Sequence, residues 1–98
     1  MGGAKDKSKT TILLVEDEVI IALGEKQELE RYGYAVTHAT TGEEAVRAAL
    51  AKDEHLDLVL MDINLGKGMD GTDAAREIIT RRDIPVVFLS SHTEREIN

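Results

Sequence analysis

The chain has 98 residues, of which 42% are hydrophobic and 32% are charged, and its formal net charge is -7. This length allows one domain, and the composition is too apolar for a disordered acidic tail and too polar for a membrane protein. The sequence contains no cysteine, which excludes disulfides, a thiolate nucleophile and cysteine-based metal sites. The negative charge disfavours nonspecific nucleic-acid binding. We therefore expect a globular cytoplasmic domain that contacts neither nucleic acid nor membrane directly.

Residues 1–9 show no apolar periodicity, so we expect a flexible tail ahead of a single domain over residues 10–98. From Thr10 onward, short apolar runs alternate with longer segments of helical period, which indicates alternating strands and helices. Two of the runs are continuously apolar inside, which favours a parallel sheet with helices on both faces. The predicted strands are residues 12–15, 34–37, 56–61 and 85–89.

The segments between these runs carry helical patterns. Residues 18–31 contain no proline and are followed by Gly33, a typical helix stop. Residues 41–44 match a capping box, which predicts that a second helix of roughly ten residues begins there. Residues 72–81 predict a third helix, and residues 91–94 resemble the start of a fourth. The predicted fold is an open, doubly wound parallel α/β sheet with right-handed crossovers.

Acidic residues follow two of the predicted strands. Glu16 and Asp17 come after the first strand, and Asp62 comes after the third. Ligands of such sheets bind at the carboxyl ends of the strands, and neighbouring strands lie about 4.8 Å apart. Asp17 and Asp62 could therefore share one cation, and oxygen ligands favour Mg²⁺. A simple polar turn at Glu16 and Asp17, and a loop role for Asp62, remain the alternatives.

Four blocks of the sequence resemble the receiver domains of two-component response regulators. The blocks are residues 12–18, 58–65, 69–71 and 86–93, and they follow the family's order at about its spacing. The resemblance implies a flavodoxin-like sheet, like that of the chemotaxis response regulator, with the strand order 2-1-3-4. It also implies that the family's usual fifth strand and fifth helix are absent from this chain.

The same resemblance implies a role for each candidate site residue. Asp62 would be the phosphoacceptor, which attacks a phosphohistidine of a sensor histidine kinase or a phosphotransfer protein. Asp17 and Asp62 would bind Mg²⁺ directly and Glu16 through water, while Asn64 would contribute its backbone carbonyl. Ser90 would be the switch hydroxyl that hydrogen-bonds the phosphoryl group. The resemblance thus implies a phosphorylation-switched signalling domain rather than an enzyme, and it leaves a homodimer open.

Three features depart from the family pattern. Glu16 stands where the family often has aspartate, and residues 65–71 contain a Gly-Lys-Gly sequence that we associate with receivers attached to sensor kinases. The family's lysine after the fifth strand has no counterpart before Asn98, and Lys67 is wrongly placed to replace it. Without a fifth strand, residues 86–89 would form a hydrophobic sheet edge that is prone to pairing. We therefore expect the chain to be part of a longer protein.

Two other function classes stay open. A phosphatase of the haloacid dehalogenase type also uses an aspartate at a strand end with Mg²⁺, but it would carry aspartate in place of Asn64 and place the motif on its first strand. A receiver-like interaction module that is never phosphorylated is compatible with the missing lysine.

Two other kinds of site are disfavoured by the sequence. The Gly-Lys-Gly sequence at residues 66–68 lacks the Ser/Thr ending of a phosphate-binding P-loop. Three scattered histidines are unlike a metal site: His38, His55 and His92.

Overall fold

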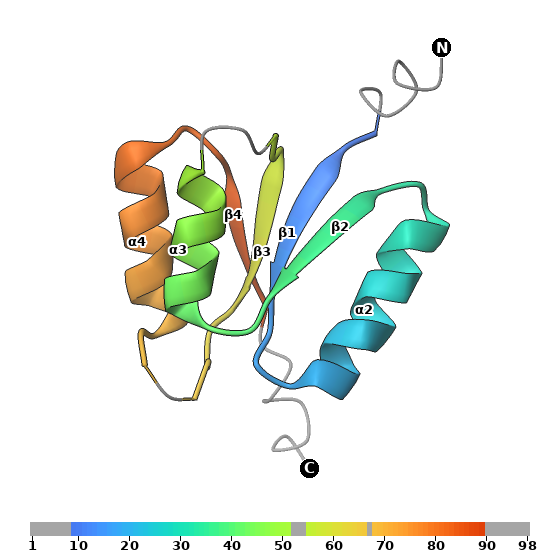
Figure 1. The fold of residues 1–98 in the computed structure, drawn as a ribbon, viewed down its shortest axis with the longest axis horizontal. Coiled ribbons are helices and arrows are strands. Elements are labelled where there is room, and N and C mark those ends of the chain that lie inside the picture. The colour runs from blue at the N-terminus through green and yellow to red at the C-terminus, as the bar shows by residue number, and fades with distance from the viewer. Residues whose placement is uncertain (1–8, 52–54, 67, 90–98) are drawn as a thin grey trace.

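The computed structural model describes residues 9–51, 55–66 and 68–89. Its strands form one sheet in the order β2-β1-β3-β4, and every neighbouring pair is parallel (Figure 1). The predicted parallel architecture and the strand order 2-1-3-4 are therefore confirmed. The strands are β1 (Thr11–Val15), β2 (Ala35–Ala39), β3 (Leu58–Asp62) and β4 (Val86–Leu89).

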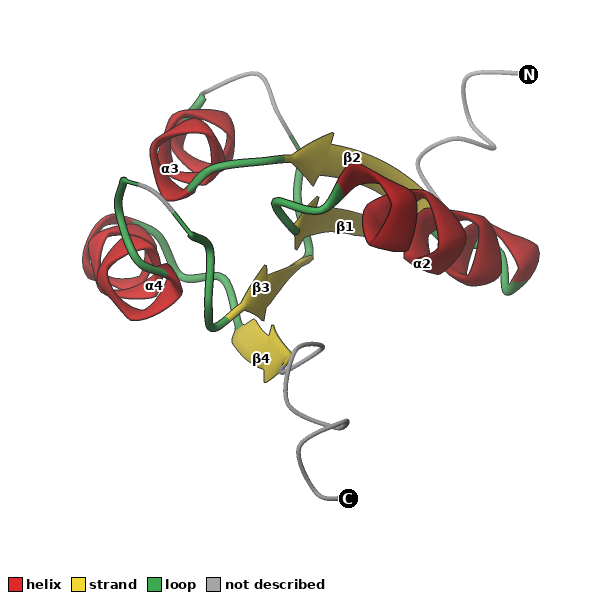
Figure 2. Ribbon diagram, turned by 90° about the horizontal axis from the view of Figure 1, so that it is seen from below, coloured by secondary structure: helices red, strands yellow, loops and turns green. Residues whose placement is uncertain are grey.

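Helices cover both faces of this sheet. Helix α2 (Val19–Arg31) lies on one face, and α3 (Gly42–Leu50) and α4 (Gly71–Arg81) lie side by side on the other (Figure 2). The predicted start of a fourth helix at residues 91–94 lies outside the described residues, as does most of the predicted N-terminal tail. None of the helices in the described ranges combines the length with the apolar character of a membrane span.

All four strands differ from the predicted ranges by at least one residue, and the differences reach two residues at the end of β2 and the start of β3. β2 runs two residues further, because His38 and Ala39 continue the pairing with β1. β3 begins only at Leu58, because the preceding residue, Asp57, forms hydrogen bonds with the first residue of β1. The N–H of Asp57 donates to the carbonyl oxygen of Thr11 at 2.9 Å, and Oδ2 of Asp57 accepts the N–H of Thr11 at 2.9 Å. Apolar runs alone did not reveal these polar anchors.

The helix ends follow the signals in the sequence. Thr41 Oγ1 accepts the N–H of Glu44 at 3.0 Å, as an N-cap does. The capping box is not fully reciprocal, because the Glu44 carboxylate accepts the N–H of Thr40 at 2.7 Å rather than that of Thr41. At the end of α2, Gly33 has a φ of 95° and donates its N–H to the carbonyl of Glu30 at 3.0 Å. A left-handed glycine of this kind ends a helix.

The main hydrophobic core lies between the sheet and the pair of helices α3 and α4. Alternate residues of a strand point to the same face, so Leu13 and Val15 of β1 enter this core together with Val59 and Met61 of β3. The helices contribute mainly small side chains, which allow them to approach the sheet closely. The buried helix residues in this core are Ala45, Ala49, Ala74 and Ile78.

Strand β4 forms one edge of the described sheet. Its apolar side chains Val87 and Phe88 are 47% and 42% exposed. On the α2 side, a shallow apolar pocket lies beside Leu14, Leu60 and Leu89. Within the described residues, β4 is therefore the hydrophobic edge strand that the sequence predicts.

Candidate metal centre

Three acidic side chains meet at the carboxyl end of the sheet. Asp62 is the last residue of β3, and Glu16 and Asp17 directly follow β1. Because Val15 pairs with Met61, the next residues along the two strands are Glu16 and Asp62. One carboxylate oxygen from each of the three acids lies within 4.8 Å of the other two. The parallel register thus brings together acids that are far apart in the sequence, as the strand pattern predicted.

Two of these carboxylates are withdrawn from solvent. Glu16 and Asp62 are fully buried, whereas Asp17 is half-buried. Each buried acid accepts a backbone N–H from two residues further along the chain: Glu16 Oε2 from Glu18 at 3.1 Å, and Asp62 Oδ1 from Asn64 at 3.2 Å. These bonds orient the carboxylates without neutralising them. Neighbouring negative charges repel strongly where water is excluded, so the cluster is suited to a cation.

His38 supports the chain from the adjacent strand β2. Its Nε2 lies 2.9 Å from the carbonyl oxygen of Glu16, and since a carbonyl can only accept, Nε2 donates the hydrogen. The N–H of Glu16 donates to the carbonyl oxygen of Ala39 at 3.0 Å. Both backbone groups of Glu16 are therefore fixed by β2. This role of His38 was not predicted, because it depends on the pairing of two strands.

The other predicted site residues are placed less completely. Asn64 is exposed, and its N–H is bound to Asp62, while the metal-binding role of its carbonyl stays a prediction. Ser90 lies outside the described residues, so its switch role also stays a prediction. Gly66 has a φ of 76°, and a Cβ at this position would lie 3.0 Å from Oδ2 of Asp17. The chain after β3 therefore passes directly beside the half-buried acid.

Gly71 allows the start of α4 to pack closely against the backbone of Asp62. The first residue of this helix lies so close to the carbonyl oxygen of Asp62 that a Cβ would overlap it, and the same Cβ would lie 3.0 Å from the carbonyl oxygen of Ile63. Both neighbours are backbone atoms, which cannot rotate away as a flexible side chain can. The glycine therefore allows α4 to begin directly against the end of β3.

A fourth acid approaches the cluster from α2. Glu25 shares the inner helix face with Ala22 and Leu29, and its Oε1 is buried and accepts no hydrogen bond from the described residues. Burial raises the pKa of Glu25, and the negative charge of Asp62 raises it further. The sequence itself marks Glu25 as unusual, because Glu25 is an acid within a helical stripe of residues that face the core.

We expect Glu25→Gln to stabilise the protein at neutral pH. Because the raised pKa means that the folded state disfavours the charged carboxylate, Glu25 lowers stability above this pKa and ceases to do so as the pH falls through it. The gain should be roughly half a kcal/mol, since solvent screens this half-exposed group. Urea unfolding from about pH 7 to about pH 4 measures the gain, which should shrink with falling pH.

Glu28→Gln is the matched control, because Glu28 lies on the same helix and forms a surface ion pair with Arg31. Oε1 of Glu28 lies 3.4 Å from Nη1 of Arg31. Its effect should be small, and it should not share this pH dependence. A Glu25→Gln variant that is less stable than the parent at neutral pH would contradict the assignment.

The donor set of this cluster suits a hard divalent cation. Three carboxylates offer oxygen ligands alone, which favours Mg²⁺ over metals that prefer nitrogen or sulfur. The burial of Glu16 and Asp62 strengthens their attraction for a cation. A carboxylate beside a bound cation can also attack phosphorus, because the cation offsets the repulsion between the two anions. The geometry therefore fits metal-assisted phosphoryl transfer.

The comparisons with known proteins agree with this geometry. Residues 12–98 match the family model of the response regulator receiver domain. The transcriptional regulatory protein PdtaR of Mycobacterium tuberculosis is 37% identical over 87 residues, which make up 88% of this chain and 41% of that protein. The chain spans between 32% and 41% of the length of the first curated relatives that it matches.

Solved structures give the same result. The N-terminal domain of a response regulator/sensory box/GGDEF protein from Carboxydothermus hydrogenoformans is 46% identical, with a TM-score of 0.79 over 87% of this chain and 67% of that one. The receiver domain of the sensor histidine kinase PA1611 from Pseudomonas aeruginosa is 32% identical, with a TM-score of 0.74 over 91% of this chain and 75% of that one. That structure is described as having a magnesium ion coordinated in its active-site cleft.

Proposed function

Because this chain belongs to the response regulator receiver domains, we propose that it accepts a phosphoryl group on Asp62 in a Mg²⁺-dependent reaction and thereby controls an output. The observation that carries this proposal is the acid cluster, in which Glu16, Asp17 and Asp62 each offer an oxygen within 4.8 Å of the others. In this proposal the domain is a phosphorylated signalling switch, and its only chemistry is the gain and loss of its own phosphoryl group.

The chain's own residues have distinct tasks in this reaction. Asp17 and Asp62 would hold Mg²⁺ directly, Glu16 would hold it through water, and Asn64 would add its backbone carbonyl. When bound, the ion would offset the negative charge of the phosphoryl oxygens. A carboxylate oxygen of Asp62 attacks the phosphorus of a phosphohistidine. The new O–P bond forms as the P–N bond breaks, and the donor imidazole keeps the electron pair and takes up a proton.

The phosphorylated aspartate then changes its surroundings. A phosphoryl group brings roughly -1.5 to -2 charges and strong acceptor oxygens to the end of β3. We propose that the hydroxyl of Ser90 is drawn to these oxygens and that the chain after β4 moves with it. Through this movement, a local change of charge alters the surface that a partner recognises.

An exposed apolar patch beside the cluster supports a protein as the phosphodonor. Val19, Ile20 and Leu23 at the start of α2 are 62%, 85% and 54% exposed, and this helix begins two residues after Asp17. Contiguous apolar side chains at a surface are typical of protein contacts. We propose that a cytoplasmic histidine kinase or phosphotransfer protein binds here and presents its phosphohistidine to Asp62.

The test is incubation with a small acyl phosphate donor and MgCl₂, followed by intact-mass measurement and phosphate release assays. The proposal predicts a single phosphoryl adduct that forms with Mg²⁺ and fails to form when EDTA removes the ion. Absence of any adduct, from the small donor or from a kinase, would favour the interaction module. Continuous release of phosphate without an adduct would favour a phosphatase.

A further inference from the structure

We infer that Glu43 is a positioning residue for the metal centre, because it holds the β3–α4 loop (residues 63–70) in place beside the acid cluster. The inference rests on the proposed function, since it concerns how the same site binds Mg²⁺. Glu43 belongs to α3, so a residue of a separate element supports the loop that carries Asn64. The described parts of this loop are residues 63–66 and 68–70.

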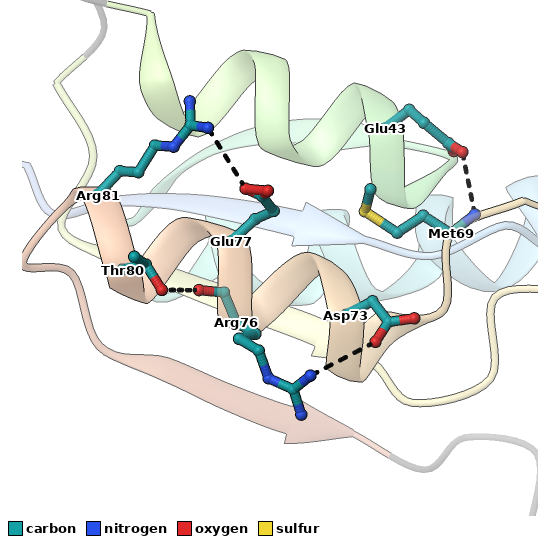
Figure 3. A pocket seen from close by; sticks show the side chains of 7 residues that line it. All are labelled: Glu43, Met69, Asp73, Arg76, Glu77, Thr80 and Arg81. Carbon is teal, nitrogen blue, oxygen red and sulfur yellow. Dashed lines mark hydrogen bonds and ion pairs between the residues drawn. The ribbon is translucent and has the colours of Figure 1, made fainter.

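The first observation is a direct bond between helix and loop. Oε2 of Glu43 accepts the backbone N–H of Met69 at 3.0 Å. Figure 3 shows the side chain reaching from the first turn of α3 to this N–H, at one end of the groove between α3 and α4. The neighbouring Glu44 turns instead to Thr40 at the start of its own helix. Glu43 therefore serves the loop rather than the helix end.

Two glycines let the loop come this close to α3. Gly68 has a φ of 82°, and a Cβ there would lie 3.0 Å from both carboxylate oxygens of Glu43. Gly42, the first residue of α3, faces the same contact, and its Cβ would lie 2.7 Å from the carbonyl oxygen of Met69. A side chain at either position would push the loop away. The close approach is thus built into both elements.

The anchored loop also touches the acid cluster. Gly66 lies against Oδ2 of Asp17, and Gly71, directly after the loop, lies against the backbone of Asp62. The bond between Glu43 and Met69 fixes the loop between these two contacts. When this bond is lost, the chain from Asn64 to Gly66 gains freedom that metal binding must then remove.

Three variants separate the bond from the charge of Glu43. Glu43→Gln removes the charge and keeps an oxygen that can accept from Met69, whereas Glu43→Ala removes both. Gly68→Ala weakens the same contact from the loop side. Glu77→Ala is the control, because Glu77 lines the same groove and pairs with Arg81 on its own helix at 3.7 Å.

The experiment combines Mg²⁺ calorimetry with hydrogen exchange of the Met69 amide. Glu43→Ala and Gly68→Ala should speed this exchange and weaken Mg²⁺ binding by about three- to tenfold, the equivalent of one hydrogen bond. Glu43→Gln should retain most of the affinity, and Glu77→Ala should bind as the parent does. Thermal unfolding checks that each variant is folded.

Different outcomes overturn different claims. Equal affinities of Glu43→Ala and Glu77→Ala would show that Glu43 has no positioning role, and equal losses in Glu43→Ala and Glu43→Gln would show that its charge alone matters. Either result leaves the proposed function intact. A parent protein that binds no Mg²⁺ would instead overturn the proposed function, and this inference with it.

Discussion

Asp62→Asn is expected to abolish the phosphoryl adduct and to make the metal-free protein more stable by about 1 kcal/mol. The amide has no anionic oxygen to attack phosphorus, so phosphorylation at this position is lost entirely. At the same time, the substitution removes one of three clustered carboxylates, two of which are fully buried. The remaining two then repel less in the folded state than three do. Loss of function and gain of stability thus have the same cause.

Intact-mass measurement with a phosphodonor and urea unfolding without metal test the two halves of this prediction. Asp73→Asn is the control, since Asp73 is exposed on α4 and its Oδ1 lies 4.0 Å from Nη1 of Arg76. This control should keep the adduct and leave stability nearly unchanged. A phosphorylated Asp62→Asn variant would place the phosphoacceptor elsewhere. A variant less stable than the parent would contradict the mutual repulsion of the cluster.

Gly71→Ala is expected to lower the free energy of unfolding by about 2–4 kcal/mol. Its new Cβ overlaps the carbonyl oxygen of Asp62, so either α4 or the end of β3 must move. Both are packed against the core, where small displacements lose many contacts. Because Asp62 would shift with its backbone, phosphorylation should also become slower. Urea unfolding and the rate of adduct formation measure the two effects.

Gly24→Ala should have the opposite effect on stability and serves as the matched control. Gly24 lies inside α2, and an added Cβ there would meet nothing within 4 Å. Alanine favours a helix interior over glycine by about 1 kcal/mol, so this variant should be more stable than the parent. If both glycine variants changed stability in the same direction and to the same degree, contact with Asp62 would not be the reason for glycine at position 71.

The sheet and the acid cluster could be predicted because each depends on a short local pattern. Buried parallel strands have continuous apolar runs, and the residues that follow such runs share one edge of the sheet. Glu16, Asp17 and Asp62 therefore met as expected once the strand order was known. The family resemblance supplied that order and the roles that we propose for the individual residues.

Other features could not be predicted from local patterns. The contacts of His38 with Glu16 and of Glu43 with Met69 join elements whose relative position only the fold determines. The late start of β3 depends on Asp57, which bonds to a strand 46 residues away. Glu25 differs from these, because its place in an apolar helical stripe was readable from the sequence.

The measurement that tests the central claim most directly is a calorimetric titration of the parent protein and Asp17→Asn with MgCl₂. Asp17 can be replaced without touching the proposed phosphoacceptor, so the titration separates metal binding from phosphoryl transfer. The parent should bind one Mg²⁺, and Asp17→Asn should bind it at least about tenfold more weakly, because it loses an anionic ligand. Equal binding by the two proteins, or no binding by the parent, would contradict a metal centre formed by Glu16, Asp17 and Asp62.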